Sequence, residues 1–122
     1  MSIITDKTSD AFRHRKAMKL NNSEVRNVQM NHWVVRTEYR LFGNLIATLD
    51  VDDFHHYMYL EINHCNWLTK TTKERLNWIL HAFGFWSIVQ RKWKWYYEDY
   101  LKSDLIPFEG KYGMEIDYYR FI

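Results

Sequence analysis

The sequence has few of the residues that build covalent cross-links or phosphate-binding loops. One cysteine (Cys65), one proline and four glycines occur among 122 residues. A single cysteine excludes an intrachain disulfide framework and suits a reducing compartment. The glycines are not grouped, so the chain has no glycine-rich phosphate loop. No Cys-x-x-Cys or His-x-x-x-His spacing occurs either, which leaves the usual zinc-binding patterns unsupported.

Long hydrophobic runs and strong charge of one sign are also missing. No run of 18 apolar residues occurs, and the first ten residues are too polar for a secretory signal. We therefore expect a cytoplasmic protein with no membrane partner. The net charge is only +2, which is too small to predict nucleic-acid binding from charge alone.

Aromatic residues, by contrast, are abundant. Six Trp, nine Tyr and seven Phe make up 18% of the chain. A single small core cannot easily enclose so many rings. We therefore expect several of them at the surface, where Trp and Tyr are favoured contact residues.

The hydrophobic pattern predicts a small sheet after a polar start. Residues 1–28 are polar and basic, and we predict an N-terminal basic arm or short helix there, followed by a single α+β domain over residues 29–122. Apolar and polar residues alternate over 35–41 and 45–51 around a tight-turn signal, which predicts a β-hairpin. The same alternation over 57–63 predicts a third antiparallel strand.

A helix and further strands are predicted in the second half. Thr71–Glu74 matches a capping box, an apolar stripe starts at Leu76, and Gly84 is a typical terminator, so we predict a helix over about residues 72–83. A fourth strand is expected over Trp86–Tyr97, followed by a loop and a short edge strand at Met114–Tyr119. The predicted fold class is α+β: an antiparallel sheet of four to five strands (β-β-β-α-β, with or without a last strand) and one main helix on one face.

The candidates for chemistry are few. Paired carboxylates near strand ends could hold Mg²⁺ in a nuclease-type site, but no lysine follows on the strand and an acidic turn explains them. A cross-strand metal site is conceivable from three histidines, although adjacent histidines tend to diverge. We predict no enzymatic activity, no catalytic residues, no metal and no cofactor. The residues considered are Asp50, Asp52, Asp53 and Glu61 for the acidic group, and His55, His56 and His64 for the metal site.

Binding residues are predicted on the helix and on the third and fourth strands. In the fourth strand, alternation separates Trp93, Trp95 and Tyr97 from Lys92, Lys94 and Tyr96, so the rings either pack under the helix or stack on a ligand. On the helix, Trp78 lies off the apolar stripe beside basic residues. The predicted partner-binding residues are Arg75, Trp78, His81, Lys92, Lys94, Tyr96, Tyr57 and Tyr59.

Residues 63–80, with the sequence NHCNWLTKTTKERLNWIL, resemble the core of a group of small, mostly uncharacterised proteins of bacteriophages and other mobile elements. That group shares a Trp, a Thr-rich cap and a Lys-Glu-Arg-Leu-Asn helix. The stretches 89–96 and 107–110 resemble its next strand and its Phe-x-Gly element. The similarity covers roughly residues 40–116, and the chain departs from it in the N-terminal arm and over 99–105.

The resemblance implies a setting rather than residue roles. Small phage proteins of this kind are often inhibitors of host or defence proteins, or DNA-associated factors. We therefore expect a non-enzymatic accessory protein, in the cytoplasm of an infected bacterial host, that binds and inhibits a host or defence complex, for example in the manner of an anti-CRISPR protein. The alternative is a nucleic-acid-binding module with a basic and aromatic strand surface. The oligomeric state stays open, with a homodimer as one option.

Overall fold

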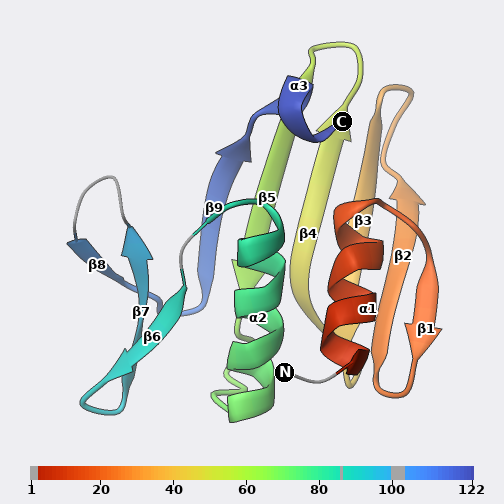
Figure 1. The fold of residues 1–122 in the computed structure, drawn as a ribbon. Helices are drawn as coiled ribbons and strands as arrows, with labels where there is room; N and C mark the ends of the chain where they lie inside the picture. Colours follow the sequence, from red (N-terminus) through yellow and green to blue (C-terminus); the bar gives the residue numbers. More distant parts are fainter. Residues whose placement is uncertain (1–2, 86, 100–103) are drawn as a thin grey trace.

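The computed structural model describes residues 3–85, 87–99 and 104–122. Its main feature is an antiparallel sheet in the order β1-β2-β3-β4-β5-β9 (Figure 1). The bounds of these strands are β1 Met18–Leu20, β2 Ser23–Gln29, β3 Val34–Leu41, β4 Asn44–Asp52, β5 Tyr57–Asn63 and β9 Lys111–Ile116. The predicted meander of three strands is confirmed as β3, β4 and β5, paired antiparallel in sequence order.

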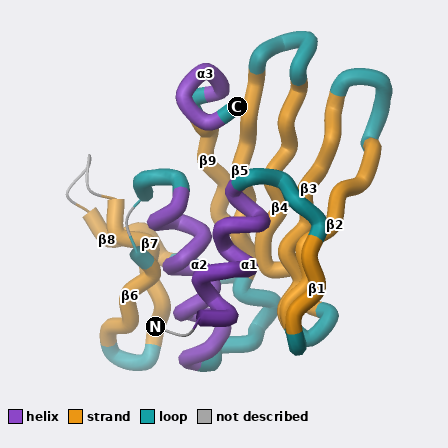
Figure 2. Tube along the Cα trace, turned by 45° about the vertical axis from the view of Figure 1, so that its right-hand side comes forward, coloured by secondary structure: helices purple, strands orange, loops and turns teal. Residues whose placement is uncertain are grey.

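Two helices lie side by side on one face of this sheet (Figures 1 and 2). They are α1, Ile3–Arg13, and α2, Lys70–Ala82. The α1 side chain of Phe12 is fully buried and meets Tyr39 of β3 edge to face at 6.0 Å. The Thr8 hydroxyl is hydrogen bonded to the Tyr39 hydroxyl at 2.7 Å. The first helix is thus fixed to the sheet by both apolar and polar contacts.

The predicted hairpin is confirmed, but its two strands do not alternate throughout. The turn between β3 and β4 has positive φ at Phe42 and Gly43, as a two-residue hairpin turn requires. Tyr39 then pairs with Ala47 whereas Arg40 pairs with Leu45, so Ile46 is an extra residue in β4. This β-bulge turns Ile46 into the core, where it is fully buried.

Helix α2 is capped differently from the prediction. Its N-cap is Thr69, whose hydroxyl accepts from the Thr72 amide at 3.2 Å, and not Thr71. At the other end Gly84 adopts φ +78°, as predicted. The Phe85 amide donates to the Leu80 carbonyl and the Gly84 amide to the His81 carbonyl, the pair of bonds that ends many helices at glycine.

A second, three-stranded sheet stands beside β9 (Figure 1). It consists of β6 Ile88–Arg91, β7 Lys94–Asp99 and β8 Asp104–Pro107. A short helix, α3 Tyr118–Phe121, follows β9 at the far end of the large sheet. None of the helices in the described part of the chain is long and apolar enough to cross a membrane.

The two faces of the large sheet differ in chemistry. The helical face carries buried side chains such as Val25, Leu49 and Leu60. The opposite face is covered by charged pairs: Arg36 donates two bonds to the Asp50 carboxylate, at 2.7 and 2.9 Å. Antiparallel sheets commonly keep one face in water in this way.

The predicted fold class is therefore wrong. The chain is mostly β, with nine strands in two sheets among the described residues, rather than four to five strands with one main helix. Residues predicted as an arm or short helix form α1, β1 and most of β2, which pairs with β3. The predicted fourth strand is instead the β6–β7 hairpin, and its first residue, Trp86, lies outside the described residues. Where a loop and a short edge strand were expected near the C-terminus, the structure has the strands β8 and β9 and the helix α3.

Candidate interaction surface

Large exposed side chains gather at the two ends of the large sheet. At the upper end in Figure 1, Trp33 and Phe54 belong to the connections between β2 and β3 and between β4 and β5, with ring centroids 5.0 Å apart. At the lower end, Phe42 lies in the β3–β4 turn and Trp67 in the connection from β5 to α2. Trp93, in the β6–β7 turn at the same end, is 89% exposed. The expected surplus of rings is thus found outside the core.

The β6–β7 hairpin holds Trp93 in an unfavourable backbone conformation. The last cross-strand pair is Arg91 with Lys94, which leaves only Lys92 and Trp93 for the turn. Their φ angles are +51° and +69°. A two-residue turn of this type favours Asn-Gly, because other residues at positive φ bring Cβ too close to the following carbonyl oxygen. Nothing in the local sequence favours this turn, so the outward tryptophan is held there by the pairing of the strands.

The connection between β5 and α2 is also tightly turned. Cys65 and Asn66 both adopt positive φ, at +54° and +60°. The Asn66 amide donates to Nδ1 of His64 at 3.0 Å, and the Trp67 amide donates to the His64 carbonyl at 2.8 Å. The buried His64 thereby anchors the loop that presents Trp67 and Leu68 to solvent.

Four exposed residues come from these turns at the same end of the sheet, and we call them the apolar strip: Phe42, Trp67, Leu68 and Trp93. Phe42 and Trp67 stack with ring centroids 6.3 Å apart and planes 11° apart. Trp67 is followed directly by Leu68, and Leu68 and Trp93 line the same pocket. Between 48% and 89% of each member is exposed. The strip therefore joins three turns that are distant in sequence.

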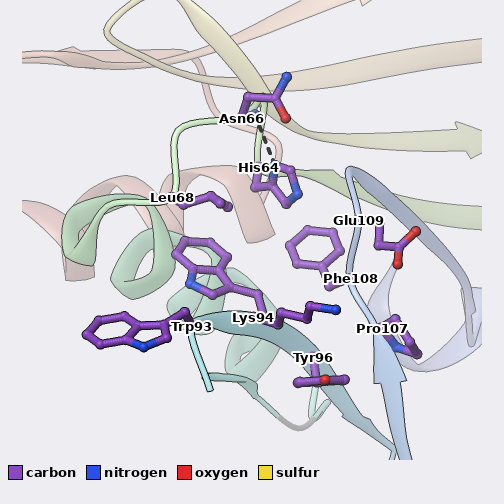
Figure 3. Close-up of a pocket in the computed structure, with 10 residues that line it drawn as sticks. His64, Asn66, Leu68, Trp93, Lys94, Tyr96, Pro107, Phe108 and Glu109 are labelled. Carbon is purple, nitrogen blue, oxygen red and sulfur yellow. Dashed lines mark hydrogen bonds between the residues drawn. The ribbon is translucent and has the colours of Figure 1, made fainter. Parts of the chain in front are cut away.

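The pocket beside the strip, which we call the hairpin pocket, has a volume of about 330 Å³. Figure 3 shows Trp93 at one end and Pro107 and Glu109 at the other, with Lys94 extending between them. Its deeper walls are buried rings: His64 lies edge to face with Trp95 at 6.0 Å and with Phe108 at 5.0 Å. The lining residues are His64, Asn66, Leu68, Trp93, Lys94, Trp95, Tyr96, Pro107, Phe108 and Glu109.

The charge around the pocket comes from the hairpin. Burial lowers the pKa of His64, more than its backbone hydrogen bonding with Phe108 raises it, so this ring is neutral at neutral pH. Arg91, Lys92 and Lys94 are exposed at the hairpin tip. Within the described parts of the chain, no ion pair holds Lys92 or Lys94. The tip is therefore cationic and open to an external anion.

The structure separates the predicted binding residues into three groups. The first, Lys92, Lys94 and Tyr96, belongs to the β6–β7 hairpin. Lys94 and Tyr96 lie opposite the buried Trp95 and Tyr97, as the alternation predicts from residue 94 onward. Trp93 breaks that alternation because it is in a turn, where its ring is solvent-exposed.

The second group lies on α2. Arg75 is 9% exposed, with a guanidinium nitrogen 3.9 Å from the Glu74 carboxylate, so it offers little surface to a partner. Trp78 is half-buried and meets the exposed His81 edge to face at 6.2 Å. The His81 ring is hydrogen bonded to the Ser87 hydroxyl at 2.7 Å. This group is not part of the apolar strip.

The third group, Tyr57 and Tyr59, lies on the polar face of the large sheet. Their rings stack at 6.2 Å with planes 10° apart. A Cβ added at Gly113 of the neighbouring strand β9 would overlap the Tyr59 hydroxyl, so the ring lies directly over that glycine. The Tyr59 ring thus covers backbone here.

The residues considered for chemistry are dispersed. Asp50 is held by Arg36, and Asp52 is held by His55 at 2.7 Å, where backbone hydrogen bonding from His55 is the main cause of its lowered pKa. His64 is buried at the opposite end of β5 from His55 and His56. Among the residues that the structure describes, no three His, Cys, Asp or Glu side chains come close enough to hold a metal ion.

Sequence reasoning missed the apolar strip. A turn signal at Phe42-Gly43 could have placed Phe42 outside the core, because a two-residue hairpin turn projects from the sheet. No comparable signal marks Trp93, since Lys-Trp is an atypical turn sequence. Trp67 lies two residues before the helix cap Thr69, a position that does not by itself indicate exposure.

Comparison with known proteins gives one family. A family model described as "Kyanoviridae Gp96 protein" matches residues 1–116. The match includes the N-terminal segment, which lies outside the stretch 40–116 on which the resemblance to phage proteins was based. Searches of curated proteins and of solved structures found no match.

Proposed function

Because the chain belongs to the Kyanoviridae Gp96 family of phage proteins, we propose that it is a non-enzymatic accessory protein that binds a protein of the infected bacterial host. In this proposal the apolar strip is the contact surface, and binding blocks the host or defence complex to which the partner belongs. A CRISPR effector is one such complex. The observation that carries the proposal is the nearly complete exposure of Trp93 on a strained turn.

Both the backbone strain and the exposure of Trp93 are unfavourable for the free protein. An exposed tryptophan does not gain the stabilisation that burial of its ring would provide. The left-handed conformation in addition destabilises the native state by about 1–2 kcal/mol per residue. Unfavourable local conformations that persist in a native protein concentrate at binding and catalytic sites. Contact with a partner would recover the burial energy.

The area of the apolar strip is suitable for the centre of an interface. Side chains of this size bury about 150–250 Å² each, so the exposed parts of the four residues amount to roughly 500 Å². The largest apolar patch of a soluble monomer is typically about 300–600 Å² and is often functional. A standard interface covers about 800 Å² per partner, so a polar rim would complete this one. Tryptophan is also the residue most enriched at energetic hot spots.

One observation favours the second candidate, a nucleic-acid-binding module. The hairpin tip, Arg91–Lys94, places three cations around an exposed ring, which is the combination that binds single strands. The positive charge is confined to that tip, however. The other end of the same small sheet carries Glu98, Asp99 and Asp104, which would repel a continuing phosphate backbone.

The proposal can be tested by affinity purification from infected bacteria. A tagged protein with Trp67→Ser and Trp93→Ser should lose its partner at least about tenfold, since both side chains are expected hot spots. The matched control is Trp33→Ser with Phe54→Ser, which removes the other exposed ring pair and should retain the partner.

The outcomes separate the candidates. Equal recovery by the strip variant and the wild type would contradict the proposal. Recovery that disappears after nuclease treatment and falls steeply with salt would instead favour the nucleic-acid-binding module.

A further inference from the structure

The hairpin pocket is small for a ligand site. Its volume, about 330 Å³, lies at the lower limit of ordinary ligand sites, which run from about 300 to 1,000 Å³. Leu68 and Trp93 belong to both the pocket and the apolar strip, so a partner lying on the strip also covers the pocket mouth. The geometry therefore favours an anchor that projects from the partner over a separate small molecule.

The walls of the pocket select the kind of anchor. Trp95 and Phe108 are buried and form an apolar interior, and His64 presents a neutral ring beside them. Aromatic rings meet preferentially edge to face or in offset stacks, and the lining rings adopt the former arrangement with each other. A further ring in the pocket can extend this packing.

The charges at the mouth select the flanking residues of the anchor. Lys94 lines the pocket, and the exposed Arg91 and Lys92 belong to the same hairpin tip. Among the described residues, neither Lys92 nor Lys94 has an ion partner. Glu109 is the one acidic residue among the described residues of the lining. The excess of positive charge at the tip complements carboxylates on either side of an inserted ring.

Resting on the proposed function, we propose that the hairpin pocket binds one aromatic side chain of the partner protein, presented by an acidic linear segment. The ring enters between Trp93, Trp95 and Phe108, and neighbouring Asp or Glu side chains pair with Lys92 and Lys94. The positive charge is confined to the hairpin tip, because the opposite end of the small sheet is acidic. A cationic patch of this length matches a short acidic segment better than a long polyanion.

The probe is a five-residue peptide, acetylated and amidated, with Phe at its centre and two acidic residues on each side. Binding is read from the indole N–H signals of the six tryptophans in a ¹H–¹⁵N spectrum, assigned by single Trp→Phe variants. We expect the indole signals of Trp93 and Trp95 to shift together at peptide concentrations below about 1 mM, with Trp33 unaffected. Two further peptides, one with Ala for Phe and one with Lys for the acidic residues, should each bind at least about tenfold more weakly.

A charge reversal gives a sharper test. Lys94→Glu changes an exposed side chain and should invert the preference, so that the Lys-bearing peptide binds better than the acidic one. Lys16→Glu, an exposed lysine after α1, is the matched control and should leave the preference unchanged. The spectra of both variants report directly whether the fold is retained.

Three results would overturn the inference. They are an absence of shifts at Trp93 and Trp95 up to about 1 mM, equal binding of the acidic and basic peptides, and tighter binding of oligothymidylate than of the acidic peptide at the same indoles. Suppose that one of these results is obtained and that the Trp67→Ser, Trp93→Ser variant still loses the partner. The assignment of the pocket is then wrong, and the proposed function stays intact. If that variant retains the partner, the proposed function itself fails.

Discussion

An Asn-Gly turn at the hairpin tip should make the protein more stable than its own Lys92-Trp93 turn does. Replacing Lys92 by Asn and Trp93 by Gly gives the preferred residues for a turn with two positive φ angles. Relief of the left-handed strain is worth about 1–2 kcal/mol per residue. Against this, Gly adds about 0.5–1 kcal/mol of backbone entropy cost. Trp93 is 89% exposed, so only about 20 Å² of its surface is buried, or roughly 0.5 kcal/mol.

Over two residues, the balance predicts a gain of about 2 kcal/mol in the free energy of unfolding. For a chain of this length that raises the thermal midpoint by about 6–10 °C, and it raises the urea midpoint by about 1 M. Urea unfolding followed by circular dichroism measures it, with Lys92→Ala, Trp93→Ala as the control. The control removes the side chains but keeps the strain, so its stability should change by less than about 0.5 kcal/mol.

The same Asn-Gly variant should lose the partner, because it removes the most exposed ring of the apolar strip. A gain in stability together with a loss of binding is the pattern expected where function maintains an unfavourable conformation. An unchanged or lower unfolding midpoint in the Asn-Gly variant would refute the reasoning, since it would mean that the Lys-Trp turn carries no strain or that Trp93 packs on the protein.

Three further predictions concern the scaffold. Gly84→Ala should lower the free energy of unfolding by about 1–2 kcal/mol, because its φ is +78°, and thermal unfolding would show a retained midpoint if this is wrong. Thr8→Val should cost about 1–3 kcal/mol by removing the partner of the buried Tyr39 hydroxyl, and adding Tyr39→Phe should recover part of that loss in urea titrations. Burial lowers the pKa of His64 below its ordinary value of about 6.5, so the unfolded state takes up the proton first and stability should fall as the pH drops below about 6.5. His64→Gln should show a smaller loss between about pH 7.5 and 5.5, and an identical loss would count against this assignment.

The central meander could be predicted because its residues follow the physical rule that the pattern expresses. Strands β3, β4 and β5 have one buried face and one in water, so alternation marks β5 throughout and β3 and β4 in part. The bulge at Ile46 could not be placed, since Leu45, Ile46 and Ala47 are all apolar and alternation does not show which of them is the extra residue. Helix α1 was missed as a core element because its packing depends on few residues, among them Phe12, within a polar segment.

The candidate surface was harder to predict for a related reason. Alternation across residues 86–97 placed Trp93 and Trp95 on one face, either packed under the helix or available to a ligand, which holds only if the strand is continuous. The structure breaks it at Lys92 and Trp93, where the sequence lacks Gly, Asn or Asp. Tertiary pairing overrides local preference there. The expectation that some rings lie outside the core came from their number alone and did not identify which ones.

Site-specific photo-crosslinking in infected bacteria tests the central claim most directly. A photoreactive phenylalanine analogue at position 93 should crosslink to one protein of defined mass, whereas the same analogue at position 33, at the other end of the sheet, should not. Crosslinking to that protein from position 33 and not from position 93 would contradict the account. So would crosslinking from position 93 to nucleic acid alone.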